Sequence, residues 1–226
     1  MEYAEFFERF FPDLTQFQSD QLTHYVSLIK TFNQRFNLIS RSDVENVWEH
    51  HIYPCVVAAN LVEIPIAAAV LDLGSGSGLP GIPLKIVRPD LNMILVDSIR
   101  KKTLFLKKVV DELGLESAET LNMRLGMDED RYGLQSRFNV VTARAVATAE
   151  ILVPLAMPLL KNDGYLLLWK GESDLPEIYE SSKKYNYSYD IIRIPVEYSD
   201  FSRRLGSTLF VKIYPDFAFR DDPGEP

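Results

Sequence analysis

The sequence has 226 residues, 46% of them apolar, and a formal net charge of −8. It is long enough to bury a sizeable core as one domain, and its composition excludes a disordered chain. Its single cysteine, Cys55, excludes an internal disulfide, and no Cys or His spacing matches a metal site. No signal-peptide pattern opens the chain and no apolar run has membrane length, so we expect a soluble protein of the reducing cytoplasm.

The first part of the chain has helical periodicity. Apolar residues recur at helical spacing from Gln16 to Phe36, which predicts an amphipathic helix with Ser19 as its N-cap. A weaker helical pattern covers Val44 to Leu61 and is interrupted by Pro54. Residues 1–66 are therefore predicted to form a small helical N-terminal region.

Beyond residue 66, short apolar runs alternate with helical stretches. The runs are AAVLDL (68–73), NMILVD (92–97), ETLNM (119–123), FNVVTA (138–143) and YLLLWK (165–170). The helical stretches cover 80–87, 99–113 and 147–160. The second of them has Ser98 as its expected N-cap and Gly114 behind its last turn. Such alternation is typical of a parallel sheet covered by helices on both faces.

The last two runs, YDIIRI (189–194) and STLFVKIY (207–214), have no predicted helix between them and indicate an antiparallel hairpin. A two-halved dinucleotide fold would instead need a sixth strand reached by another crossover helix. Five parallel strands followed by a hairpin are typical of class I S-adenosylmethionine-dependent methyltransferases. We therefore predict an α/β fold of this class, Rossmann-like and seven-stranded, for residues 67–226.

The segment VLDLGSGSGLPG (70–81) places four glycines directly behind an apolar run. Its second half, Gly-Ser-Gly-Leu-Pro-Gly, matches the loop that binds a dinucleotide pyrophosphate. In another register a carboxylate, Asp72, ends the strand and is followed by alternating glycines, namely Gly74, Gly76 and Gly78. A carboxylate here suits the ammonium group of S-adenosylmethionine better than a phosphate.

Asp97 ends the second apolar run, where an acid is placed to accept both ribose hydroxyls of an adenosine. The alternative is an acid that only favours the dipole of the helix beginning at Ser98. All three histidines precede the glycine loop, so none follows a later strand as the proton donor of a dehydrogenase. The sequence therefore favours S-adenosylmethionine over a nicotinamide cofactor.

Longer segments carry a family resemblance. They are FNQRFNLIS (32–40), LDLGSGSGLPGIPLKIVRPD (71–90), LVDSIRKKTLFLKKVVDELGL (95–115), RFNVVTARAVA (137–147), MPLLKNDG (157–164) and WKG (169–171). With these segments the chain resembles the bacterial glucose-inhibited division protein B family, the 16S ribosomal RNA guanine-N7 methyltransferases. The resemblance extends over residues 16–171 and loosely beyond.

The resemblance implies which residues meet the methyl donor. Four of them lie in or after the first and third strands, namely Gly74, Leu79, Leu125 and Gly126. A fifth, Arg144, would bind the methionine carboxylate or hydrogen-bond guanine O6, and its alternative is a structural salt bridge to Asp72 or Asp97. Three further cations are candidates for RNA contacts, namely Lys170, Arg203 and Arg204, and the alternative for each is a solvent-exposed charge without a ligand.

The chain departs from the family at three places. The third-strand site has Arg124-Leu125-Gly126 where the family has Gly-Arg-Ala-Glu. The family's His-Ile-x-Asp-Ser is replaced by His51-Ile52-Tyr53-Pro54-Cys55. A tail ending in DFAFRDDPGEP replaces a basic one, and the acidic net charge is unusual for an RNA-binding enzyme.

Guanine N7 has an in-plane lone pair and no proton to lose. Methyl transfer to it needs alignment rather than a base, so no catalytic acid or base is assigned. Cys55 precedes the glycine loop and is expected to be a buried small residue rather than a nucleophile. Two alternatives stay open: a methyltransferase for a small-molecule or protein acceptor, and a non-catalytic adenosyl-binding module associated with RNA.

Overall fold

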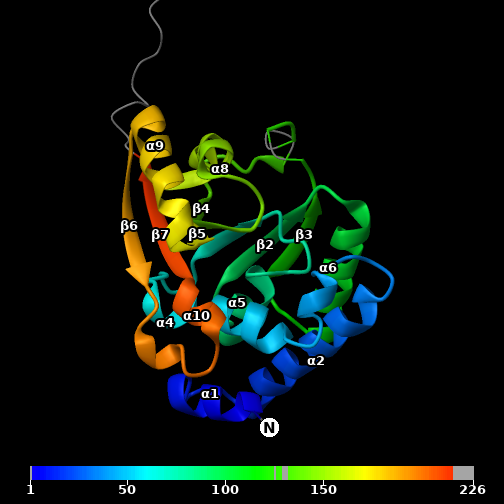
Figure 1. The fold of residues 1–226 in the computed structure, drawn as a ribbon. Helices are drawn as coiled ribbons and strands as arrows, with labels where there is room; N and C mark the ends of the chain where they lie inside the picture. The colour runs from blue at the N-terminus through cyan, green and yellow to red at the C-terminus, as the bar shows by residue number, and fades with distance from the viewer. Residues whose placement is uncertain (1, 125, 129–131, 216–226) are drawn as a thin grey trace, which may run out of the picture.

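The computed structural model describes residues 2–124, 126–128 and 132–215. A seven-stranded sheet crosses its centre in the order β3-β2-β1-β4-β5-β7-β6 (Figure 1). The strands are β1 (Ala69–Leu73), β2 (Asn92–Asp97), β3 (Ala118–Asn122), β4 (Phe138–Arg144), β5 (Leu160–Lys170), β6 (Tyr187–Arg193) and β7 (Leu209–Pro215). The strands β1 to β5 are parallel, and β7 pairs antiparallel with both β5 and β6. The predicted parallel sheet with a final antiparallel hairpin is confirmed.

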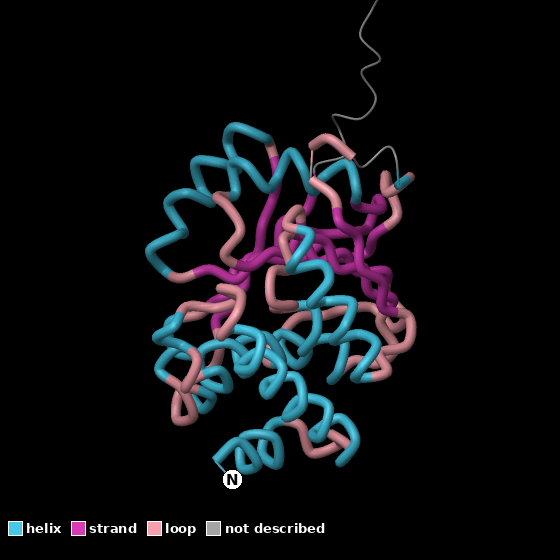
Figure 2. Tube along the Cα trace, turned by 90° about the vertical axis from the view of Figure 1, so that its right-hand side faces the viewer, coloured by secondary structure: helices cyan, strands magenta, loops and turns pink. Residues whose placement is uncertain are grey.

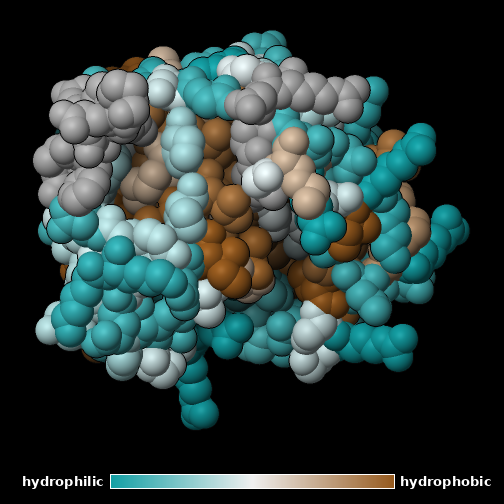
Figure 3. All heavy atoms as spheres, turned by 90° about the horizontal axis from the view of Figure 1, so that it is seen from above, coloured by the Kyte–Doolittle hydropathy of each residue, from teal (hydrophilic) through white to brown (hydrophobic). Residues whose placement is uncertain are grey.

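Helices cover both faces of this sheet (Figures 1 and 2). They are α1 (Glu2–Phe10), α2 (Gln16–Asn33), α3 (Tyr53–Val56), α4 (Ala58–Leu61), α5 (Gly81–Val87), α6 (Arg100–Leu113), α8 (Ala149–Ala156), α9 (Leu175–Tyr185) and α10 (Arg203–Ser207). Successive strand residues point to opposite faces, so Val140 joins the core under α2, α5 and α6, whereas Val141 joins the core under α8 and α9. Seen from above, hydrophobic residues gather in the middle of this face of the molecule between hydrophilic ones (Figure 3).

Helix α2 begins where the periodicity predicts, but Ser19 is not its N-cap. Thr15 takes that position, with its Oγ1 accepting from the Gln18 amide at 3.2 Å and its own amide donating to Gln18 Oε1 at 3.0 Å. This reciprocal capping box satisfies two amides that the helix itself leaves without partners.

The cap of α6 also differs from the prediction. Ile99 is the N-cap, and Asp97 Oδ1 accepts from the Ile99 amide at 2.7 Å, so Ser98 plays no capping role. Gly114 closes the helix in the left-handed conformation, as predicted.

Three predicted connections are wrong in detail. The segment 147–160 is helical only over α8 and a following 3-10 turn, because β5 already begins at Leu160. Helix α9, between β5 and β6, was missed. The hairpin loop contains α10, which begins at Arg203 with Ser202 Oγ accepting from the Arg204 amide at 3.0 Å.

The N-terminal segment shares the core of the sheet. The predicted helix over 44–61 is broken into a π-helical turn (Trp48–Ile52), α3 and α4. Side chains such as Ile52 and Val56 belong to the same buried cluster as Val70 of β1. The division of the chain at residue 66 stays a prediction. No helix among the described residues has the length and apolarity to span a bilayer.

Candidate active site

A cavity of about 640 Å³ opens at the carboxyl ends of β1, β4 and β5. This is the edge of an open parallel sheet at which ligands bind. One side is the glycine loop, residues 74–79, of which Gly74 to Ser77 and Leu79 line the cavity. A second part of the lining, at the end of β5 and on α10, is a charged wall formed by Lys170, Asp174 and Arg204, and β4 lies between β5 and β1.

The glycines of the loop have two different functions. Gly76, at φ +59°, faces the cavity, and an added Cβ would meet no atom closer than 3.7 Å. Gly78, at φ +96°, does not line the cavity, and a Cβ there would lie 2.5 Å from Ile82 Cγ1. The first glycine therefore offers bare backbone to a ligand, and the second lets the loop pack against α5.

Asp72 lies behind the glycine loop and does not line the cavity. Its Oδ1 accepts from Thr142 Oγ1 at 2.7 Å and its Oδ2 from the Gly81 amide at 3.2 Å. Complete burial raises the pKa of this carboxyl to about 6. The observed contacts brace β1 against β4 and the start of α5, and the predicted contact with an ammonium group stays a prediction.

Asp97 ends β2 as predicted and holds the loop from the other side. Its Oδ2 accepts from the Gly76 amide at 3.0 Å while its Oδ1 engages Ile99. Ser75 adds a third brace, because its Oγ donates to the Asp72 carbonyl and accepts from the Val96 amide. The shape of the loop is thus fixed before any ligand arrives.

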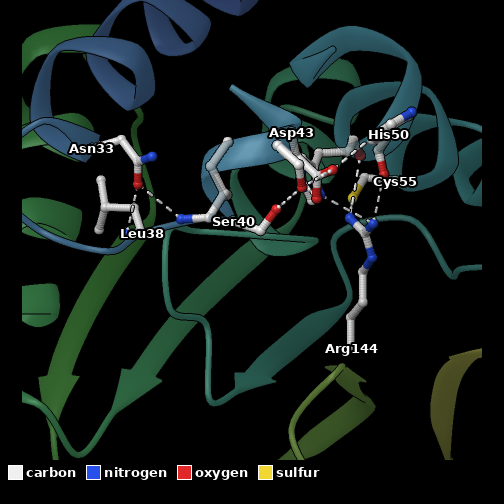
Figure 4. A network of polar contacts seen from close by, with 10 residues as sticks. Asn33, Leu38, Ser40, Asp43, His50, Cys55 and Arg144 are labelled. Carbon is white, nitrogen blue, oxygen red and sulfur yellow. Dashed lines mark hydrogen bonds and ion pairs between the residues drawn. The ribbon is translucent and has the colours of Figure 1, made fainter. Parts of the chain in front are cut away.

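Arg144 extends from the end of β4 to the N-terminal segment, where its guanidinium donates to backbone and side-chain acceptors (Figure 4). Its Nη2 donates to the His50 carbonyl at 2.8 Å, and its Nη1 donates to the His51 carbonyl at 3.3 Å and to Cys55 Sγ at 3.2 Å. We call these groups the Arg144 receptor. The alternative of a salt bridge to Asp72 or Asp97 is wrong.

Pro54 explains why a carbonyl is available for Arg144. In an α-helix the amide of residue 54 would donate to the His50 carbonyl, but proline has no N–H. Arg144 supplies that missing donor. Cys55 is fully buried, and burial raises the pKa of its thiol to about 11 despite the nearby guanidinium. It is a buried small residue, as predicted, and not an activated nucleophile.

His51 and Asp43 also line the cavity, and sequence reasoning missed both. His51 Nδ1 lies 3.3 Å from Arg144 Nη2, and its Nε2 lies 3.3 Å from Asp43 Oδ2. Because guanidinium only donates, this Nδ1 carries no proton. Burial, followed by Arg144, lowers the pKa of His51 to about 4, so the ring is neutral near pH 7. The signal in the sequence that could have identified His51 is the His51-Ile52 pair, which this chain shares with the family's His-Ile-x-Asp-Ser motif.

The same segment supplies apolar lining. The Asn33 side chain accepts from the amides of Leu38 and Ile39 at 2.8 and 3.0 Å, which fixes the turn after α2 (Figure 4). Both residues line the cavity. A wall of the site therefore comes from the N-terminal region.

The predicted RNA-contacting cations are placed differently from one another. Lys170 lines the cavity with its amino group 3.4 Å from Glu177 Oε1, which also accepts from the Ala149 amide. Arg203 and Arg204 are both exposed, and only Arg204 lines the cavity.

The structure does not confirm the predicted contacts of Gly126 and Leu125 with the methyl donor. Gly126 is exposed and does not line the cavity, and Leu125 lies outside the described residues. Across the described ranges, no group of three or more His, Cys, Asp or Glu side chains is placed to hold a metal ion.

A family model described as rRNA small subunit methyltransferase G matches residues 18–198. The chain belongs to this family. Its relatives named Ribosomal RNA small subunit methyltransferase G include one from Desulforamulus reducens, 34% identical over 76% of this chain and 71% of the relative. Another, from Lysinibacillus sphaericus, is 32% identical over 83% of this chain and 82% of the relative.

Solved structures show the same fold. A predicted O-methyltransferase from Agrobacterium tumefaciens has a TM-score of 0.55 at 17% identity, covering 70% of this chain and 79% of its own. The fibrillarin/Nop5p complex matches with a TM-score of 0.55 at 14% identity, covering 73% and 80%. The rRNA small subunit methyltransferase G family and this fold make the protein a class I methyltransferase that uses S-adenosylmethionine.

The cavity fits that methyl donor. Gly76 lines the cavity with bare backbone, and its amide is held in place by Asp97. The volume of about 640 Å³ lies within the range of small-molecule sites.

Proposed function

We propose that the protein transfers a methyl group from S-adenosylmethionine to N7 of a guanine in 16S ribosomal RNA, acting in the cytoplasm. The observation that carries this proposal is the position of Arg144. It is fixed by its receptor at the cavity wall, between the glycine loop and the charged wall. The positive charge of a cation held in this way stabilises a nearby anionic or carbonyl group of a ligand without having to reorganise.

The glycine loop is the proposed donor site. Gly74, Gly76 and Leu79 would contact the donor directly, while Asp97 and Asp72 hold the loop in shape. When bound, S-adenosylmethionine supplies an electrophilic methyl group on its sulfonium. The contacts from Leu125 and Gly126 remain proposals that rest on the family resemblance.

The chain's own contribution to the chemistry is alignment. N7 loses no proton, so the reaction needs no base. His51 is partly buried and neutral, and its ring nitrogens already face Arg144 and Asp43. Arg144 would bind the methionine carboxylate or guanine O6, and Lys170 and Arg204 would bind the RNA from the charged wall. Fixing the two reactants in this way is worth roughly seven kcal/mol or more of barrier in favourable cases.

The test is tritiated methyl transfer to small ribosomal subunits that lack the modification, followed by mapping of the labelled base. The expected result is label at N7 of one guanine of 16S RNA. Label on another acceptor would contradict the proposed RNA substrate. Binding of S-adenosylmethionine in calorimetry without any methyl transfer would instead indicate a non-catalytic adenosyl-binding module.

A further inference from the structure

Two carboxylates line the cavity among the described residues, and their surroundings differ. Asp43 faces His50 and His51, at 3.0 and 3.3 Å from their ring nitrogens. Asp174 uses one oxygen, Oδ2, to accept from the Gly171 amide at 2.8 Å. Within the described part of the chain its other oxygen has neither a hydrogen bond nor an ion pair, so Asp174 has an acceptor to offer a ligand.

Asp174 is held in a fixed position on the charged wall. It ends the 3-10 turn Glu172–Asp174, which directly follows β5 and Gly171. A Cβ added to Gly171 would lie 3.5 Å from the Ser207 carbonyl and 3.8 Å from Asp174 Oδ2. Gly171 therefore lies close to both the end of α10 and the Asp174 carboxylate, which lines the cavity together with the glycine loop.

A carboxylate beside cations on one wall complements the Watson–Crick edge of guanine. Guanine presents two adjacent donors on this edge, N1–H and the 2-amino group, next to the acceptor O6. Adenine would place the N1 lone pair against the carboxylate instead. RNA enzymes that act on unstacked bases recognise them on this edge.

We propose that Asp174 accepts hydrogen bonds from N1–H and the 2-amino group of the target guanine and thereby selects guanine. This inference rests on the proposed function. Lys170 and Arg204 are the cations of the charged wall available to O6, which lies between that edge and N7. The base would thus lie with N7 toward the glycine loop and its Watson–Crick edge toward Asp174.

The same contact favours the reaction itself. As N7 is methylated, its lone pair becomes the new N–C bond, the C–S bonding pair stays on sulfur, and no proton leaves. The positive charge moves from the sulfonium to the purine, which makes N1–H and the 2-amino group stronger donors. A carboxylate on these donors binds the charged product-like state more tightly than the neutral base.

The experiment compares two acceptors. They are small subunits assembled with unmodified 16S RNA and the same subunits with a single inosine at the mapped guanine. Inosine keeps N7, O6 and N1–H but lacks the 2-amino group. The wild-type enzyme is expected to lose about tenfold or more in kcat/KM on inosine, because a site built for a bidentate contact rejects an analogue that leaves it unpaired.

Asp174→Asn is the test variant. The asparagine oxygen can still accept from the Gly171 amide, but its NH2 group, which only donates, would face the N1–H and 2-amino donors of guanine. We expect roughly thirtyfold lower kcat/KM on guanine, a guanine-to-inosine ratio near one, and unchanged donor affinity by calorimetry. Glu172→Gln is the matched control, since Glu172 lies on the same turn outside the cavity and pairs with Arg193 at 2.7 Å. It should keep the wild-type ratio.

Three results would overturn the proposal. If Asp174→Asn keeps the wild-type ratio, or weakens donor binding as much as transfer, Asp174 does not select the base. If the wild-type enzyme labels no guanine at all, the proposed function fails and the inference fails with it.

Discussion

The two sides of the cavity are built in opposite ways. The glycine loop comes from one stretch of chain, and its polar supports, Asp72, Asp97 and Ser75, spend their hydrogen bonds on the protein itself. The charged wall, together with Arg144 and His51, gathers side chains from positions far apart in the sequence. We therefore expect substitutions on the loop side to lower stability and alter the loop, and substitutions on the wall to alter kinetics with the RNA acceptor.

Arg144 connects the two sides, so its loss should have the largest effect. We expect Arg144→Ala to lower kcat/KM by about a hundredfold to a thousandfold, because a preorganised charge is removed from the reacting groups. The protein should still unfold cooperatively, as followed by circular dichroism. Arg193→Ala is the control, because Arg193 pairs with Glu172 at the surface and neither residue lines the cavity. Near-normal turnover would contradict the role given to Arg144.

On the loop side, Gly78→Ala tests packing. The new Cβ would lie 2.5 Å from Ile82 Cγ1 and 3.0 Å from the Tyr25 hydroxyl, at φ +96°. We expect a loss of about 3 kcal/mol in the free energy of unfolding, from strain and overpacking together.

Gly114→Ala is the matched control for that variant. It also has a left-handed backbone, at φ +60°, but no atom lies within 4 Å of the added Cβ. It should cost only about 1 kcal/mol. Equal losses in urea denaturation would show that backbone strain alone, and not loop packing, decides the effect.

The pKa of Asp72 gives the loop side a pH signature. Its folded-state value of about 6 exceeds the unfolded one, so the folded protein binds more protons between about pH 4 and 6. The Asp72 contribution to stability is therefore lost as pH rises through this window. Asp72→Asn cannot ionise, so its stability relative to wild type should rise by about 2 kcal/mol from pH 4 to 7 in urea denaturation. A constant difference would contradict this.

The smallest effect is expected on the wall. Arg204→Ala removes a cation at the cavity and should raise KM for the RNA acceptor about threefold, with a smaller salt dependence. Arg203→Ala, one residue away and outside the lining, should change KM by less than half as much. Equal effects would mean that the RNA contacts both arginines on the surface of α10.

The sequence predicts the loop side well because its signal is local. Alternating glycines after a strand, and an acid at the end of the next strand, define a loop whatever lies around it. The wall could not be predicted in this way. Asp174 is one acid among many in the sequence, and only the packing of Gly171 beside Ser207 places it at the cavity.

Arg144 shows the same limit of prediction from local sequence patterns. Its importance follows from the family resemblance, but its partners do not. A proline that removes one amide, together with a π-helical turn, makes backbone carbonyls of the N-terminal segment the partners of the guanidinium. No pattern of residue types encodes that carbonyl.

Because Cys55 belongs to the Arg144 receptor, its reaction with a thiol reagent can report on the opening of this site. It is the chain's single cysteine, it is buried, and at neutral pH the raised pKa leaves its thiol almost entirely protonated. A thiol reagent in solution can therefore modify the protein only when the N-terminal segment separates from the end of β4. The labelling rate, followed with no engineered tag, would report how often the enzyme opens and whether donor or RNA keeps it closed.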